Sequence, residues 1–476
     1  MAIQRYSDFD GLELARMVAE NEVSATELLE EAIERAERVN PQINAVVYPY
    51  YDEARERAYA GLPDGPFTGV PFLLKDLYLL YAGQPMSNGS RIFADYVPDH
   101  DHEMTTRYKA AGLSIFGRST SPEFGITATT ESILHGKTRN PWNLEHTAGG
   151  SSGGAAAAVA AGILPVANAS DGGGSIRIPA SCCGLFGLKP TRARTPAGPD
   201  VGEGWAGQST IHAVSRSVRD SAALLDATAG PDLGAPYYPP PPERPWLDEV
   251  GRDPGNLRVG VITTAFNGVE THPECVAAVD LAADLCRQLG LEVEEAELEI
   301  PEELRIALWN VVRPSTLVAV QDRAAQLGRE PNPEDVEPIT WQMINSEQPS
   351  AADYIRATRA VHAIGRIVAG FFTGYDLMLT PTMAMPPFPL GHLNLDRDDM
   401  RAQGEDVAYT VAYTSTFNSA GNPAASIPLY WNEDGLPIGT HFVAPYGDEA
   451  SLIRIGSALE QAQPWANRKP PVHSDA

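Results

Sequence analysis

The first part of the chain carries apolar residues at helical spacing. This periodicity predicts two helices, over about Gly11 to Glu20 and Ala25 to Val39. Ser24 precedes the second helix and Glu27 follows three positions later, which is the pattern of a capping box. Because proline disrupts a helix interior, the Asn40-Pro41 pair should end this helix.

Further along, short apolar runs alternate with helical patterns. Such runs predict buried strands, and their alternation with helices favours an α/β sheet. We expect helices near Glu103 to Ala111, over Pro273 to Leu289 and over Ser451 to Gln463, with a mostly helical segment ending near Phe372. The expected strands lie in GVPFLLKDLYLL, LSIFGRS, LRVGVIT, LEVEEAEL, YDLMLTPT and ASIPLY, with a turn at GLPIG. LRVGVIT, the helix after it and LEVEEAEL should form one β-α-β unit.

Two stretches differ from the rest in composition. Between Gly149 and Pro190 the chain is rich in Gly, Ala and Ser, and AAAAVAAG predicts a helix that packs closely against its neighbours. Between Pro236 and Pro245 the chain is proline-rich, which excludes a helix or an inner strand. This second stretch should be a stiff surface connection.

The chain of 476 residues has a formal net charge of −27. Such a surface repels phosphate backbones and anionic lipids, so we expect neither a nucleic acid nor a membrane as a main partner. The N-terminal MAIQRYSDFDGLELARM predicts no signal peptide, and no apolar run reaches membrane-spanning length. The four cysteines form no CxxC pair and are too few for a disulfide framework. We therefore expect a cytoplasmic protein, with Cys182 and Cys183 acting as small packed residues.

One motif, GGSSG, matches the G-x-S-x-G elbow of α/β-hydrolases, with Ser151 as the nucleophile. An elbow follows a strand, and the preceding TRNPWNLEHTA is polar and lacks alternation. A phosphate-binding loop is excluded as well, because no Lys-Ser or Lys-Thr follows the glycines.

A second glycine-rich stretch, DGGGSIRIPA, begins at Asp171. Consecutive glycines let backbone N–H groups converge beside Ser175, and converging donors stabilise the oxyanion of an acyl-transfer intermediate. Ser175 is therefore a candidate nucleophile. The alternative is a tight turn in which Ser175 only caps the next element.

A serine nucleophile needs a base, and histidine is the usual one. None of the ten histidines lies in a comparable glycine-rich stretch. Lys75 lies inside the apolar run VPFLLKDLYLL, and burial there would lower its pKa towards neutrality. A neutral lysine can accept a proton, so Lys75 is the candidate base. The alternative is a solvated turn formed by Lys75 and Asp76.

Together these pieces resemble the amidase signature family, serine amidases with a Ser-Ser-Lys triad. The family pattern is a GGSSGG loop, an Ala-rich helix and D-x-G-x-S-[hydrophobic]-R-x-P, which GGSSGGAAAAVAAGILPVANASDGGGSIRIPA fits. The spacing of the two serines and of the lysine in GVPFLLKD agrees, and GLFGLKPTRAR, YDLMLTPT, GNPAASIP and GLPIG extend the match. One departure is Ala193, where many members have glycine.

The resemblance implies a fold and a set of roles. The fold would be α/β, a large mixed, mostly parallel central sheet with helices on both faces. It would form one domain over residues 1–476, with an N-terminal helical segment (about 1–45) and an inserted α/β subregion (about 250–375). Lys75 would be the base, Ser151 a proton relay after a cis peptide bond, and Ser175 the nucleophile.

The resemblance also implies the surroundings of the reaction. The oxyanion would bind the N–H groups of Gly172, Gly173, Gly174 and Ser175, with Asp171 and Arg177 bracing that loop. The substrate would lie along Gly125, Ile126 and Thr127. No metal or organic cofactor is implied, and the enzyme would be a monomer or homodimer.

The substrate class is a hypothesis with rivals. TRNPWN, SIRIPAS, KPTRAR and QPWANRKPP look similar to hydrolases of nylon-type cyclic oligomers and to bacterial amidases that cleave aryl amides or urethanes. The first alternative is the glutaminase subunit of a tRNA-dependent amidotransferase, which shares the triad. The second is a histidine-dependent serine esterase, and the third is a non-catalytic protein that keeps the fold.

Overall fold

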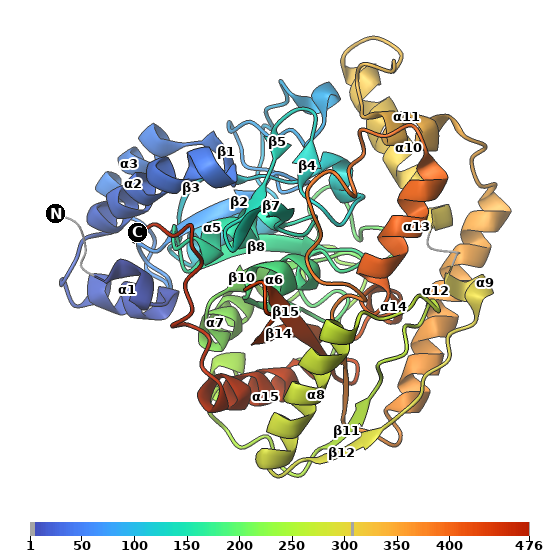
Figure 1. Cartoon of the computed structure of the whole chain (residues 1–476). Helices are drawn as coiled ribbons and strands as arrows, with labels where there is room; N and C mark the ends of the chain where they lie inside the picture. The colour runs from blue at the N-terminus through green and yellow to red at the C-terminus, as the bar shows by residue number, and fades with distance from the viewer. Residues whose placement is uncertain (1–4, 306–308, 476) are drawn as a thin grey trace.

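An eight-stranded sheet runs through the computed structural model, which describes residues 5–305 and 309–475 (Figure 1). Its strands are β8 (Val166–Asp171), β9 (Phe186–Lys189), β10 (Thr210–Ser215), β11 (Arg258–Val261), β12 (Glu292–Glu295), β13 (Leu377–Pro381), β14 (Ala424–Trp431) and β15 (Pro437–Val443). Their order across the sheet is β12-β11-β13-β15-β14-β9-β10-β8.

Helices cover both faces of this sheet, as expected for an α/β protein. They are α1 (Gly11–Ala19), α2 (Ala25–Ile43), α3 (Tyr51–Ala60), α4 (Glu103–Ala110), α5 (Gly153–Ala160), α6 (Arg177–Cys183), α7 (Val218–Thr228), α8 (Pro273–Gln288), α9 (Glu302–Arg305), α10 (Trp309–Gln326), α11 (Pro338–Asn345), α12 (Ala351–Phe371), α13 (Met400–Val411), α14 (Ser415–Ala420) and α15 (Glu449–Ala462). Helices α7, α8 and α15 pack on one face, and α5, α6, α12 and α14 pack on the other.

The sheet is mixed, as predicted, but the expectation that it is mostly parallel is wrong. Only β12, β11 and β13 are parallel to one another, and every other neighbouring pair is antiparallel. Parallel neighbours need a long crossover, which α8 provides between β11 and β12. The hairpin from β14 to β15 instead turns within Asn432 to Gly435. GLPIG is therefore only partly a turn, because β15 begins at Pro437.

A three-stranded sheet lies beside the edge of the large one. It contains β1 (Val46–Pro49), β3 (Ser114–Ser119) and β2 (Pro71–Lys75), in that order. At its end, the backbone N–H of Lys75 donates to Asn168 Oδ1 in β8 at 3.0 Å. This contact brings the last residue of β2 to the edge strand of the large sheet.

The predicted helices agree with the structure to within a few residues, with one correction. The capping box of Ser24 and Glu27 is present at the start of α2. Pro41 does not end that helix, which continues to Ile43. Pro41 lies in the last turn, where a missing N–H and a ring clash cost less than in the middle of a helix.

The polar stretch before Ser151 also differs from expectation. It forms the antiparallel ribbon of β6 (Arg139–Asn140) and β7 (Asn143–Thr147), where the sequence predicted no strand. The Asn140 side chain donates to the carbonyls of Thr147 and Cys182, so polar contacts hold the ribbon and hydrophobic alternation is not needed. A second short ribbon contains β4 (Glu131–Ser132) and β5 (Gly136–Lys137).

The Ala-rich helix α5 is buried along its whole length, as its composition predicted. A Cβ atom added at Gly154 would lie 2.3 Å from the backbone nitrogen of Thr120. Glycine is therefore required there for α5 to approach the end of β3. Four short 3₁₀ helices complete the described elements, at Tyr6–Asp8, Arg91–Phe93, Glu123–Gly125 and Trp246–Glu249.

Other expectations concern the surface and the thiols. Residues 236–245 form neither a helix nor a strand and lie mostly exposed, which confirms the surface connection. All four cysteines are free and buried. Within residues 5–305 and 309–475, no helix is both long and apolar enough to span a membrane.

The domain boundaries stay predictions. Residues 1–4 of the expected N-terminal segment and residues 306–308 of the expected inserted subregion lie outside the described residues. The described remainder of that subregion contains β11, α8, β12 and the helices α9 to α12. This is the β-α-β unit followed by helices that the sequence predicted.

Candidate active site

Lys75 is completely buried at the end of β2. Its Nζ lies 2.7 Å from Ser151 Oγ and 3.0 Å from Ser170 Oγ, both within hydrogen-bond distance. The alternative of a solvated turn at Lys75 and Asp76 is therefore wrong. Asp76 is also buried and accepts hydrogen bonds from the backbone of Ser87 and of Gly89.

Burial lowers the pKa of Lys75 from 10.5 to about 7, and the negative charge of Asp171 opposes this shift. The ammonium is disfavoured because the protein interior solvates it less well than water does. A substantial fraction of Lys75 is therefore neutral near pH 7, which is what a base requires.

Ser151 lies between strand β7 and helix α5, and its side chain is buried. The peptide bond between Gly150 and Ser151 is cis, as the resemblance implied. Thr130 Oγ1 contacts both sides of this loop, donating to the Gly149 carbonyl and accepting from the Gly153 N–H. The loop is thus fixed by one hydroxyl group from outside it.

Ser175 lies in the turn between β8 and α6 and lines a cavity of about 310 Å³. The same cavity is lined by Gly172 and Gly173 and by the three predicted substrate-contact residues Gly125, Ile126 and Thr127. A Cβ atom added at Gly125 would lie 3.0 Å from Ser151 Oγ, so the Ser151 hydroxyl lies directly behind this part of the wall. Among the described residues, no hydrogen bond joins Ser151 to Ser175.

The loop from Asp171 to Ser175 is held by a fully buried ion pair. The Asp171 carboxylate accepts from Arg177 Nε at 2.9 Å, from the Gly174 N–H at 2.7 Å and from the Ile176 N–H at 3.2 Å. Burial alone would raise the pKa of Asp171, but the charge and hydrogen bonds of Arg177 hold it well below its usual range. Asp171 and Arg177 thus brace the loop, as expected.

One predicted oxyanion donor is wrong. The Gly174 N–H points at Asp171 Oδ1 and is already engaged, so it is not available to a substrate oxygen. Gly174 has a φ of 140°, a backbone conformation that side-chain-bearing residues rarely adopt. Glycine at this position lets the chain turn so that its N–H meets the carboxylate.

Two residues that the sequence analysis missed hold the same loop from behind. Thr414 Oγ1 donates to the Gly173 carbonyl at 2.7 Å. Asn418 Nδ2 donates to Asp171 Oδ1 at 2.8 Å, and Asn418 Oδ1 accepts from Arg177 Nη2 at 2.6 Å. Both residues are far from the loop in the sequence and belong to no motif, so no local signal identifies them.

The remaining walls of the cavity are mostly apolar and come from distant segments. The sequence analysis named none of these wall residues as substrate contacts. Besides small and aliphatic side chains, they include Trp205, Phe266, Arg305 and Trp309. Among the described lining residues none is a histidine, which favours lysine over histidine as the base.

Comparison with known proteins identifies the family of the chain. The family model described as "Amidase" matches residues 27–453. The chain is 37% identical to the 6-aminohexanoate-cyclic-dimer hydrolase of Paenarthrobacter ureafaciens, over 97% of this chain and 96% of that protein.

Solved structures give the same result. A 6-aminohexanoate cyclic dimer hydrolase complexed with substrate superposes with a TM-score of 0.93 at 35% identity, covering 98% of this chain and 99% of the other. A bacterial aryl acylamidase of the amidase signature family superposes with a TM-score of 0.88 at 27% identity, covering 97% and 99%. The chain is an amide-hydrolysing enzyme and belongs to the amidase signature family.

Proposed function

We propose that the chain hydrolyses the C–N bond of a non-peptide amide through an acyl-enzyme on Ser175, with Lys75 and Ser151 as the proton relay. The observation that carries the proposal is the 2.7 Å contact between Lys75 Nζ and Ser151 Oγ, two side chains that are both buried. When the amine is neutral, its lone pair can accept the Ser151 proton. Ser170 Oγ then accepts a hydrogen from the same nitrogen.

In the acylation step, Ser175 Oγ bonds to the amide carbon while its proton passes to Ser151 and the Ser151 proton passes to Lys75. The carbonyl electron pair moves to oxygen, and the N–H groups of Gly172, Gly173 and Ser175 stabilise the oxyanion. One such donor is typically worth about 3 to 4 kcal/mol of transition-state stabilisation. This relay needs a Ser151–Ser175 hydrogen bond, which we expect to form when substrate is bound.

In the next step of the reaction, the proton moves back along the relay. Lys75 returns its proton through Ser151 to the leaving nitrogen, the C–N bond breaks and the amine leaves. Water then adds to the acyl carbon, giving its proton to the same relay. The ester bond to Ser175 breaks, the oxygen of Ser175 takes the proton back, and a carboxylic acid is released.

The proposed substrate is a nylon-type oligomer, an aryl amide or a urethane. The names of the two similar solved proteins support the first two classes. The mostly apolar cavity walls also suit a methylene chain or an aromatic ring better than a highly polar substrate.

The experiment is covalent trapping combined with turnover. Ser175→Ala should lose both labelling by a fluorophosphonate, followed by intact mass, and hydrolysis of every amide in a panel of anilides, nylon oligomers, carbamates and glutamine. Ser151→Ala should be labelled more slowly and turn over less. Ser152→Ala is the matched control, because this hydroxyl contacts the backbone of Ser170 instead of Lys75.

Full turnover in Ser175→Ala would contradict the nucleophile. Turnover restricted to glutamine would favour the amidotransferase alternative. Absence of labelling and of turnover in the wild-type protein would favour a non-catalytic role.

The remaining expectations are a cytoplasmic location and a monomeric or homodimeric state. The four free, buried thiols are consistent with a reducing compartment. Light scattering coupled to size-exclusion chromatography measures the oligomeric state.

A further inference from the structure

The cavity in front of Ser175 has one charged residue in its described wall. Most of its lining is apolar, including Ile126, Trp205, Phe266 and Trp309. Arg305 is the exception, and no aspartate or glutamate is among the described lining residues. A cation in an apolar site is costly unless something compensates its charge.

Arg305 is the last described residue of α9, immediately before residues 306–308. Its Nε donates to the Ile300 carbonyl at 3.3 Å, which fixes the side chain without neutralising it. Among the described residues, no carboxylate lies within ion-pair distance of Arg305.

Arg305 belongs to the minority of described arginines that form no ion pair. The protein has 62 acidic residues against 35 lysines and arginines. Many arginines therefore have acidic partners, such as Arg16 with three glutamates and Arg194 with Glu449. An arginine without such a partner, placed on a cavity wall, is available to a ligand.

The chemistry of the ligand follows from the guanidinium. It is a permanent cation whose planar donors match a carboxylate in two parallel hydrogen bonds. Arg305 is only partly exposed, so water screens this attraction less than it would on the open surface. A single cation balances a single negative charge, which favours a carboxylate over a phosphate dianion on a protein of net charge −27.

We propose that Arg305 is a specificity-determining residue that binds the carboxylate of an open-chain amide substrate. The carboxylate would be joined to the scissile amide by an apolar spacer that packs against the aromatic and aliphatic walls. The substrate class is thus an N-acylated ω-amino acid, cleaved at the amide held by Ser175. This inference rests on the proposed function, because it places the scissile bond at Ser175.

A pair of compounds tests it by binding and by turnover. N-benzoyl-6-aminohexanoate carries the carboxylate, and N-benzoyl-6-aminohexan-1-ol has a neutral hydroxymethyl group in its place. Dissociation constants are measured calorimetrically with Ser175→Ala and with Ser175→Ala combined with Arg305→Gln. Turnover of both compounds is measured with the wild type, Arg305→Gln, Arg305→Lys and the control Arg356→Gln, whose arginine is exposed on α12.

We expect Ser175→Ala to bind the acid roughly tenfold or more tightly than the alcohol, and Arg305→Gln to remove that preference. In turnover, Arg305→Gln should raise KM for the acid and leave kcat/KM for the alcohol within about twofold. Arg305→Lys should retain part of the preference, and Arg356→Gln should retain all of it.

Three results would overturn the inference. The first is that Ser175→Ala binds both compounds equally, and the second is that it binds neither of them. The third is that Arg305→Gln lowers kcat/KM equally for both compounds. The proposed function fails in a different way, because it requires that Ser175→Ala lose hydrolysis of every amide.

Discussion

The proposed base and its relay depend on one buried amine. Lys75 is the last residue of β2, and the residues before it in this strand are apolar. Among the described residues, its side-chain nitrogen forms hydrogen bonds only with the hydroxyls of Ser151 and Ser170. No carboxylate forms an ion pair with it among the described residues, so burial decides its protonation. A lysine beside a carboxylate would stay charged and could not act as a base at neutral pH.

The pKa of about 7 predicts the pH dependence of the reaction. Protonated Lys75 cannot accept the Ser151 proton, so kcat/KM should fall about tenfold per pH unit below 7 and reach a plateau above it. Lys75→Ala should lower kcat/KM by about two to four orders of magnitude on that plateau. The measurement is a pH–rate profile with an anilide whose own ionisation lies outside the range.

Lys189 provides the control for this profile. It is also buried, and burial lowers its pKa to about 7, but its Nζ donates to the Pro190 carbonyl. In Lys189→Met, kcat/KM should therefore still fall below pH 7, as in the wild type. Absence of that fall in Lys189→Met, or full activity in Lys75→Ala, would show that the base has been assigned wrongly.

The same shift affects stability. Between pH 7 and 10.5 the unfolded chain binds a proton at Lys75 that the folded chain does not, so this group makes the free energy of unfolding rise with pH across that window. The proposed base is thus a residue that destabilises the fold at neutral pH.

Much of the site at this scale could be predicted from sequence, because glycine spacing and an unexpected lysine leave local signals. Ser175 and Gly125 line one cavity, and Lys75 contacts Ser151, whose hydroxyl lies behind Gly125. Gly174 was assigned the wrong partner, because the direction of an N–H depends on φ and ψ. The sequence does not specify these angles for a glycine.

At the scale of elements, α14 supports the loop from Asp171 to Ser175, which carries the proposed oxyanion donors. Thr414 immediately precedes this helix and Asn418 lies within it, and both bond to the Asp171–Gly173 segment. Without these bonds, the Gly172 and Gly173 N–H groups would lose their fixed direction. Fixed donors stabilise an oxyanion better than mobile ones because they need no reorganisation.

Thr414→Val tests this support with almost no change in shape. The variant loses the hydrogen bond to the Gly173 carbonyl, so kcat should fall about tenfold while KM changes little. Thr358→Val, which removes an exposed hydroxyl on α12, is the control and should change neither constant. A parallel rise in KM would indicate a damaged cavity, and an unchanged kcat would show that Thr414 does not position the donors.

Elements with regular periodicity could be predicted, and elements shaped by distant contacts could not. The β11-α8-β12 unit follows from its own pattern. The β6–β7 ribbon has no such pattern, because the Asn140 side chain holds it to α6. Likewise, the sequence around Pro437 indicates a turn, but pairing with β14 makes Pro437 the first residue of β15.

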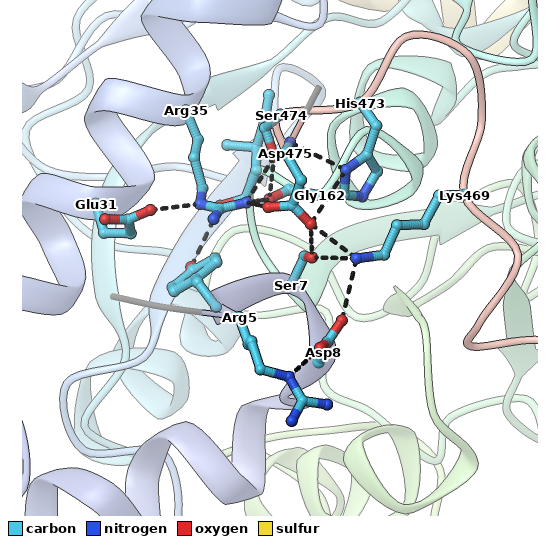
Figure 2. A network of polar contacts seen from close by, with 12 residues as sticks. Arg5, Ser7, Asp8, Glu31, Arg35, Gly162, Lys469, His473, Ser474 and Asp475 are labelled. Carbon is cyan, nitrogen blue, oxygen red and sulfur yellow. Dashed lines mark hydrogen bonds and ion pairs between the residues drawn. The ribbon is translucent and has the colours of Figure 1, made fainter. Parts of the chain in front are cut away.

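At the scale of the whole molecule, the two ends of the described chain are tied together. Figure 2 shows Arg35 of α2 between Glu31 and Asp475, at 2.8 Å and 2.7 Å. Arg35 also donates to Ser474 Oγ, and its guanidinium lies over the Tyr6 ring. Lys469 joins Asp8 to Asp475 at the edge of the same network.

Arg35→Ala should lower the free energy of unfolding by about 3 kcal/mol, because it removes a buried guanidinium that bonds to Glu31, Ser474 and Asp475. Activity should be unchanged in the folded protein. The half-exposed Arg55, paired with Glu30, is the control, and Arg55→Ala should cost less than about 1 kcal/mol. Urea unfolding at pH 7 measures both, and equal losses would contradict a special role for this network.

The global topology was the least predictable feature. The α/β class follows from alternation, but strand direction depends on which distant segments become neighbours. β13 pairs with β15, and β14 pairs with β9, and both of these pairs of non-consecutive strands are antiparallel. Nothing in the sequence of any single strand encodes that order.

The proposed reacting groups and several walls of the cavity come from different parts of the protein. Lys75, Ser151 and Ser175 belong to the segments around β2, α5 and α6, whereas Arg305, Trp309 and the lining residues of α13 come from helices added after β12. Substitutions in those later helices can change what is recognised while the bond-breaking apparatus stays intact. The architecture thus lets new substrate ranges evolve one wall at a time, without passing through an inactive ancestor.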